Sequence, residues 1–174
     1  MRPLRTVLAV VLIAMLAFAG CGKSTKTAAT DTGSDTATCP TSNTKSFAKT
    51  KFVFHVGLAA GTFHRYIYKP FKAGTFKKGA HGRIRALLKA GATALLDAHE
   101  LKLAKEDVQA NPTLCKILIG PLHALEGKFS SLKGKIAGGD TSSLDGINTD
   151  LTSLAATSKQ NGAAINETTD ENGG

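Results

Sequence analysis

The sequence predicts an all-α protein, an up-down-up-down four-helix bundle that follows a disordered linker. Four segments carry apolar residues at helical spacing, and no segment shows the sustained apolar–polar alternation of strands. Short connections join these segments, which are of similar length, and this favours antiparallel neighbours. We therefore expect one helical bundle domain over residues 47–165.

The first helix is predicted from about Phe47 to Tyr68. Gly57 and Gly61 lie beside its apolar face, and glycine costs about 1 kcal/mol in a helix interior. The pair therefore predicts the close approach of a neighbouring helix. Pro70 is expected to end this helix, because proline cannot donate the next hydrogen bond. The apolar face consists of Phe52, Val56, Ala59, Ala60, Phe63 and Ile67.

The second helix is predicted from about His81 to Glu106, before the break at Asn111-Pro112. Six residues recur at helical spacing on one side of this helix and are expected to face the core. These residues are Ile84, Leu87, Leu88, Gly91, Leu95 and Ala98. Charged residues occupy the opposite side and are expected in solvent, namely Arg85, Lys89, Asp97 and Glu100.

The third helix carries the most regular apolar stripe. Thr113 is a suitable capping residue for it, and Gly120-Pro121 predicts a kink. Gly138-Gly139-Asp140 is expected to end this helix and open the fourth, with Ser142-Ser143 helping to cap it. The stripe of the third helix is Leu114, Leu118, Leu122, Leu125, Phe129, Leu132 and Ile136. The apolar positions of the fourth are Leu144, Ile147, Leu151, Leu154 and Ile165.

The first 21 residues have the organisation of a secretory signal. Basic residues in Met1–Arg5 precede an apolar run that ends at Ala19, and small residues lead to Cys21. The sequence Ala19-Gly20-Cys21 resembles the lipobox of bacterial lipoproteins, although Phe18 stands where leucine is usual. The alternatives are an ordinary secretory signal that is cut near Ala19 and an uncleaved anchor helix.

The lipobox resemblance implies a signal peptide over residues 1–20, cleavage before Cys21, and a diacylglyceryl group on the Cys21 thiol. The membrane is then a partner through this lipid, and the protein lies on the extracytoplasmic face of the bacterial cell membrane. The Ala-, Gly- and Thr-rich body is similar in composition to uncharacterised lipoproteins of high-GC Gram-positive bacteria.

Polar segments are expected on both sides of the bundle. Residues 21–46 contain the lipidated cysteine and a Thr/Ser-rich stretch with no large apolar residue, so they predict a flexible tether. Residues 166–174 are polar and acidic and predict a disordered tail.

Cys39 and Cys115 are the two cysteines left after Cys21, and disulfides persist outside the cytoplasm. In an up-down-up-down bundle the first and third helices begin at the same end. Cys39 precedes the first helix and Cys115 lies in the first turn of the third. A Cys39–Cys115 disulfide is therefore predicted, and the closure of about 75 residues contributes roughly 3–4 kcal/mol.

Basic residues dominate the first half of the bundle. The 22 Lys and Arg residues fall to 20 without Arg2 and Arg5, against 13 acidic residues, which leaves a net charge of +7. Residues 45–89 contain no acidic residue, and a one-sign stretch attracts anionic lipid or an anionic cell-wall polymer. The alternative is an ordinary solvated surface. The candidate surface consists of Arg65, Lys69, Lys72, Lys77, Lys78, Arg83 and Arg85. Nucleic acid is not expected, because the signal directs the protein out of the cell.

The sequence carries little that indicates catalysis. It has no Gly-x-Ser-x-Gly elbow and no phosphate-binding glycine loop, and no histidine pair has the spacing of a helical metal site. We therefore expect a non-catalytic binding or structural ectodomain without a cofactor. The alternative is a metal- or haem-binding lipoprotein that uses His55, His64 or His99.

Overall fold

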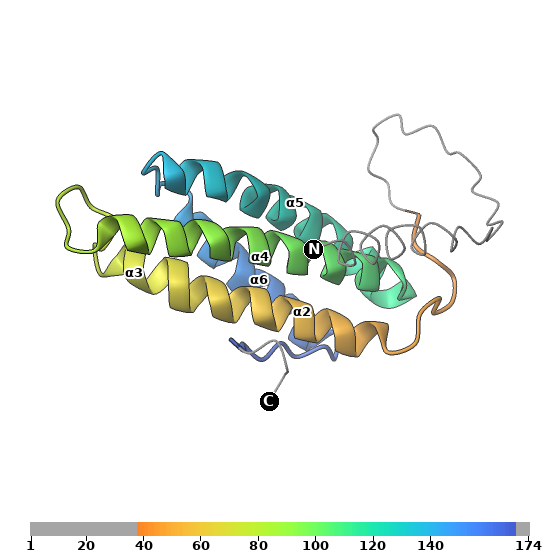
Figure 1. Ribbon diagram of the computed structural model, residues 1–174. Coiled ribbons are helices and arrows are strands. Elements are labelled where there is room, and N and C mark those ends of the chain that lie inside the picture. The colour runs from red at the N-terminus through yellow and green to blue at the C-terminus, as the bar shows by residue number, and fades with distance from the viewer. Residues whose placement is uncertain (1–37, 170–174) are drawn as a thin grey trace, which may run out of the picture. The chain divides into compact units, whose positions relative to one another are not determined.

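The computed structural model describes residues 38–169 and is an all-α bundle in this range. The long helices are α2 (Ala48–Phe63), α4 (Arg83–Gln109), α5 (Pro112–Ala137) and α6 (Leu144–Gln160). They alternate in direction, and α4 packs against both α2 and α5 while α5 packs against α6 (Figure 1). Residues 38–169 contain no strand. The predicted helical bundle is confirmed.

Pro70 does not end the first helix, as the sequence had suggested. A π-helical segment, η1 (His64–Tyr68), follows α2 and leads directly into the short helix α3 (Lys69–Lys72), which contains Pro70. The N–H of Lys69 bonds to the carbonyl of His64, five residues back. A π turn changes the hydrogen-bond register. Here the change comes just before Pro70, which has no N–H to donate. The helical backbone therefore continues past Pro70.

The close approach at Gly57 and Gly61 is made by the extended C-terminal segment and not by a helix. A Cβ atom at Gly57 would lie 2.2 Å from the carbonyl oxygen of Asn166, and one at Gly61 would lie 2.1 Å from that of Thr168. The N–H of Thr168 also donates to the carbonyl of Gly57 over 3.0 Å. Residues 166–169 therefore pack on α2, which corrects the expectation of a disordered tail for these four residues. Residues 170–174 lie outside the described part.

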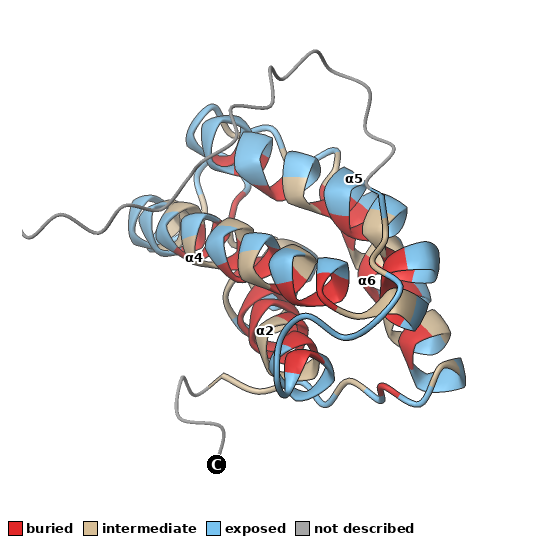
Figure 2. Cartoon of the chain, turned by 90° about the vertical axis from the view of Figure 1, so that its right-hand side faces the viewer, coloured by how far each residue is buried: buried red, intermediate tan, exposed pale blue. Residues whose placement is uncertain are grey.

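Helix α4 is rotated relative to the prediction, so that part of its expected core face is exposed and part of its expected solvent face is buried. Arg85 and Lys89 are exposed as predicted, and Leu87 and Ala98 are partly buried against the core. Ile84 and Leu88 are 74% and 71% exposed and Leu95 is 49% exposed, whereas Asp97 and Glu100 are buried. The small side chains of the buried face allow α4 to lie close to both α2 and α5, and its polar side chains find partners on α2. Figure 2 shows this buried side facing the other helices. The buried residues of α4 are Ala90, Thr93, Ala94, Asp97, Glu100, Leu101, Ala104, Asp107 and Val108.

Helix α5 supplies the central apolar stripe of the core, as predicted. All seven stripe residues from Leu114 to Ile136 are buried, and the helix runs through Pro121 without interruption. Its cap is Asn111 and not Thr113. The Asn111 side-chain oxygen accepts the N–H groups of Thr113 and Leu114 at 3.1 and 2.9 Å. The cap lies one residue before Pro112, which suits the first helical position.

Helix α6 buries its four predicted apolar positions between Leu144 and Leu154. Ile165 lies beyond the end of this helix, in the extended C-terminal segment, where it is partly buried against the core. The Ser143 side chain makes no capping bond. Instead, Asp140 Oδ1 accepts hydrogen bonds from the N–H and the hydroxyl of Ser142 at 2.9 and 2.7 Å.

The predicted disulfide between Cys39 and Cys115 is present, with 5.6 Å between the two Cα atoms. It joins the segment before α2 to the first turn of α5. The N–H of Thr44 also bonds to the carbonyl of Ala110 over 3.0 Å, which attaches the same segment to the end of α4. We call this the disulfide end of the bundle. Cys21, the predicted lipidation site, lies outside the described residues.

Candidate functional site

The seven predicted basic residues gather at the end of the bundle opposite the disulfide. Arg65 lies in η1, Lys69 and Lys72 lie in α3, Lys77 and Lys78 lie in the loop 73–82, and Arg83 and Arg85 lie in the first turn of α4. The turn from α3 into α4 brings these segments together (Figure 1). We call this group of seven residues the basic end.

A hollow of about 300 Å³ opens at the basic end, between the loop 73–82 and the turn from α5 to α6. Lys77, Lys78 and Arg83 contribute its cationic groups, and Thr141 contributes a hydroxyl from the opposite side. Sequence reasoning missed Thr141, because it lies about 60 residues further along the chain. The remaining lining residues are Phe71, Gly74, Phe76, Gly138 and Gly139.

Three members of the basic end are engaged within the fold. Arg65 Nη1 donates to the hydroxyl of Thr169 in the C-terminal segment over 3.5 Å. Arg83 Nε donates to the carbonyl of Phe76 at 2.9 Å, and a Cβ atom at Gly139 would lie 3.1 Å from Arg83 Nη2. Arg83 therefore holds the loop next to the α5–α6 turn. Lys72 forms an ion pair of 3.6 Å with Asp145, which also accepts a hydrogen bond from the Tyr68 hydroxyl. That bond raises the pKa of Tyr68 above its ordinary value.

The other four cations of the basic end have no carboxylate partner in the part of the chain that the structure describes. Within residues 38–169, no carboxylate lies at ion-pair distance from Lys69, Lys77, Lys78 or Arg85. Asp140 is the acidic residue of the adjacent turn, and its hydrogen bonds from Ser142 lower the pKa of its carboxyl. The basic end is therefore strongly cationic but not free of negative charge.

His55 lies between two carboxylates at the interface of α2 and α4. Its Nδ1 is 2.6 Å from Glu100 Oε2, and its Nε2 is 3.7 Å from Asp107 Oδ2. Lys45 lies 3.9 Å from Asp107. Burial raises the pKa of Asp107, and the charges of His55 and Lys45 oppose that shift. These contacts give the buried acidic residues of α4 their partners, and they connect α4 to α2.

Asp97 is a second buried carboxyl at this interface. Thr62 Oγ1 lies 2.6 Å from the carbonyl of Leu58 and 2.5 Å from Asp97 Oδ1. The Thr62 hydroxyl has one proton to donate, and both oxygens lie within its reach. Burial also raises the pKa of Asp97 well above its usual range. The hydrogen bond from Thr62 opposes this rise, and Asp97 Oδ2 has no protein partner in the described range.

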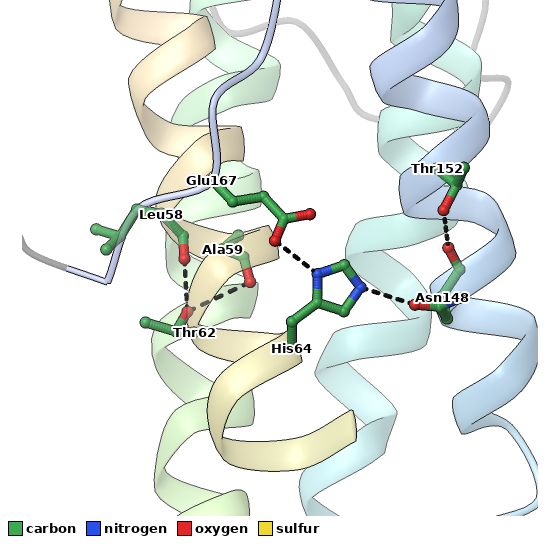
Figure 3. A network of polar contacts seen from close by, with 7 residues as sticks. All are labelled: Leu58, Ala59, Thr62, His64, Asn148, Thr152 and Glu167. Carbon is green, nitrogen blue, oxygen red and sulfur yellow. Dashed lines mark hydrogen bonds and ion pairs between the residues drawn. The ribbon is translucent and has the colours of Figure 1, made fainter. Parts of the chain in front are cut away.

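His64 joins three parts of the chain. Its Nδ1 is 2.9 Å from Glu167 in the C-terminal segment, and its Nε2 is 2.7 Å from the side-chain oxygen of Asn148 in α6 (Figure 3). The π segment that carries His64 therefore contacts both the C-terminal segment and α6. This contact holds residues 166–169 against the bundle.

The three histidines that were predicted as alternative metal ligands, His55, His64 and His99, do not come together at one site. Both ring nitrogens of His55 and of His64 face carboxylate or amide groups, and His99 is exposed on α4. Among the described residues, no group of three or more His, Cys, Asp or Glu side chains is arranged to hold a metal ion.

Comparison with known proteins gives no family assignment, since no family model, no curated protein and no solved structure matches the chain. No helix within residues 38–169 combines the length and the apolar character needed to cross a bilayer. The functional argument therefore rests on the residues themselves.

Proposed function

We propose that the protein is a membrane-anchored lipoprotein of the bacterial cell envelope, whose helical bundle is a non-catalytic binding module for an anionic partner. The anchor is the lipid on Cys21, inferred from its lipobox-like sequence. The binding surface is the basic end. The partner presents repeated anionic groups, as anionic lipid headgroups and envelope polymers do.

The free cations around the end hollow carry this proposal. Lys69, Lys77 and Lys78 belong to adjoining turns of the chain and have no carboxylate partner among the described residues. Cations without partners keep their charge available to an external anion. Each lysine near an anionic surface contributes about 1 kcal/mol of attraction, which weakens with salt.

A charge-matched comparison tests the proposal. We expect the variant Lys69→Gln/Lys77→Gln/Lys78→Gln to bind phosphatidylglycerol vesicles or soluble polyphosphate at least about tenfold more weakly at low salt. Both variants are made in a soluble form that contains residues 22–174 and therefore every residue that the structure describes. The control, Lys102→Gln/Lys116→Gln/Lys159→Gln, removes three exposed lysines elsewhere on the bundle and has the same net charge. An equal loss of affinity in both variants would mean that binding depends on net charge and not on the basic end, which would contradict the proposal. The absence of wild-type binding to either anion would also refute it.

The anchor is tested separately. In a bacterial host that processes lipoproteins, we expect the full chain to be labelled by a fatty acid and to sediment with membranes. Cys21→Ser should lose the label. An unlabelled wild-type chain would instead indicate one of the alternative signals.

A further inference from the structure

The outer face of α4 is apolar and exposed, and the basic end does not account for it. Ile84, Leu88 and Leu95 recur at helical spacing on this face and are 74%, 71% and 49% exposed. They line a groove of about 550 Å³ between α4 and α5, together with Leu87, Gly91, Ala92 and Ala137. Exposed aliphatic residues that gather in one groove mark an interaction site more often than isolated ones do.

Cations border the groove on both sides. At 100° per residue, Arg85 and Lys89 lie about 100–140° from Ile84, on the side toward η1. Lys89 Nζ lies 4.0 Å from the centre of the Tyr66 ring, which agrees with that placement. Lys133 lines the opposite wall, from α5, and Arg83 completes the lining. The groove is therefore an apolar strip with Arg85 and Lys89 on one side and Lys133 on the other.

Negative charge is absent from this strip in the described part of the chain. The acidic residues of α4 begin at Asp97, and Asp97, Glu100 and Asp107 are buried on the other side of the helix. Glu126 of α5 is engaged by Lys105. An occupant that satisfies both chemical features therefore has an apolar part and negative charges beside it.

We infer that the outer face of α4 docks on an anionic lipid leaflet, with Ile84, Leu88 and Leu95 entering the region below the headgroups. The flanking cations bind lipid phosphates, as interfacial helices with basic flanks do. This deepens the proposed function, on which it rests, by selecting lipid over polymer as the anionic partner. A polymer without apolar groups leaves the groove unfilled.

The charge of the groove also argues against a second copy of the chain as its occupant. Two copies that met through this face would bring Arg85, Lys89 and Lys133 of each together, with no carboxylate of the described face to balance them. The position of the face supports the leaflet. It lies along the side of the bundle and adjoins the basic end, so both surfaces can contact one membrane plane.

Single tryptophans provide a direct test, because the chain contains none. In residues 22–174, Leu88→Trp should shift its emission to the blue on phosphatidylglycerol vesicles, and brominated acyl chains should quench it. Ile117→Trp, on α5, is the control and should show neither change. Vesicle binding without quenching at position 88 would overturn the inference. So would a concentration-dependent shift without lipid, which would identify a second copy as the occupant.

A second variant separates this inference from the proposed function. Ile84→Ser/Leu88→Ser/Leu95→Ser should bind phosphatidylglycerol vesicles at least about tenfold more weakly and keep its affinity for soluble polyphosphate within about twofold. The control, Phe47→Ser/Ile117→Ser, removes exposed apolar residues outside the groove and should leave both affinities unchanged. Unaltered vesicle binding by the groove variant would overturn the inference alone. Failure of the wild type to bind either anion would overturn the proposed function as well.

Discussion

Helices α4 and α5 lie side by side and have nearly the same length, yet they use their large apolar residues in opposite ways. Helix α5 buries its whole leucine stripe, with Leu118, Leu122 and Leu132 fully inaccessible. Helix α4 exposes Ile84 and Leu88 and buries alanines and acidic residues instead. The comparison teaches that a helical apolar stripe identifies a special face of a helix, whereas the neighbouring helices decide whether that face is core or surface.

The largest expected contrast between the two helices is in stability. Phe129 of α5 is fully buried and packs edge-on against Phe63, with 5.4 Å between the ring centres. Phe129→Ala should therefore lower the free energy of unfolding by about 3–5 kcal/mol in urea titrations. Leu88→Ala, on the outer face of α4, should change it by less than about 0.5 kcal/mol. Equal losses would mean that the face of α4 is part of the core.

The covalent anchor of α5 is expected to have the next largest effect. The disulfide connects residues 76 apart in the sequence and restricts the unfolded chain. Cys39→Ala/Cys115→Ala should lower the free energy of unfolding by about 3–4 kcal/mol in the chain-entropy model. The same measurement on the wild type under reducing conditions serves as a control and should give a similar loss. An unchanged midpoint in both would show that the segment before α2 contributes no stability through this bond.

A smaller, pH-dependent effect is expected from the buried face of α4. The pKa of Asp97 is raised in the folded state above the ordinary value of 3.8. Above pH 3.8 the unfolded chain releases this proton and the folded chain keeps it, so stability falls as the pH rises toward the folded-state pKa. The substitution Asp97→Asn replaces the carboxyl with an amide that does not titrate and whose oxygen can accept the Thr62 hydroxyl as the carboxyl does.

We therefore expect Asp97→Asn to gain stability relative to the wild type between pH 4 and pH 8, as measured by urea unfolding across that range. Asp107, whose pKa is raised by burial, should leave a weaker pH dependence in the variant. A difference between variant and wild type that stays constant with pH would contradict a raised pKa of Asp97 in the folded state.

Several features of the bundle could be predicted from sequence because they depend on local or strongly periodic signals. The stripe of α5 has leucine at nearly every inward position, which leaves one way to bury it. The topology then placed Cys39 and Cys115 at one end. The basic end was also predictable, because its seven residues all lie within one stretch of the chain, residues 65–85.

The face of α4 could not be predicted in the same way, because this helix has two apolar arcs. One contains large aliphatic residues, and the other contains Ala90, Ala94 and Ala104 beside acidic residues. Hydrophobicity alone favours the first arc. The second is buried because small side chains let α4 approach two helices at once, while Thr62 and His55 of α2 provide partners for its carboxyls.

The sequence by itself determined the all-α class, the order of the helices, the core face of α5, and the concentration of positive charge near the turn before α4. Only the tertiary structure decided which face of α4 meets water and where the C-terminal segment packs. It also decided that Lys133 joins the groove beside α4 and that Thr141 joins the hollow at the basic end. The physical reason is that periodicity and charge are properties of one segment. Burial and the pairing of polar groups depend on the segments that pack beside it.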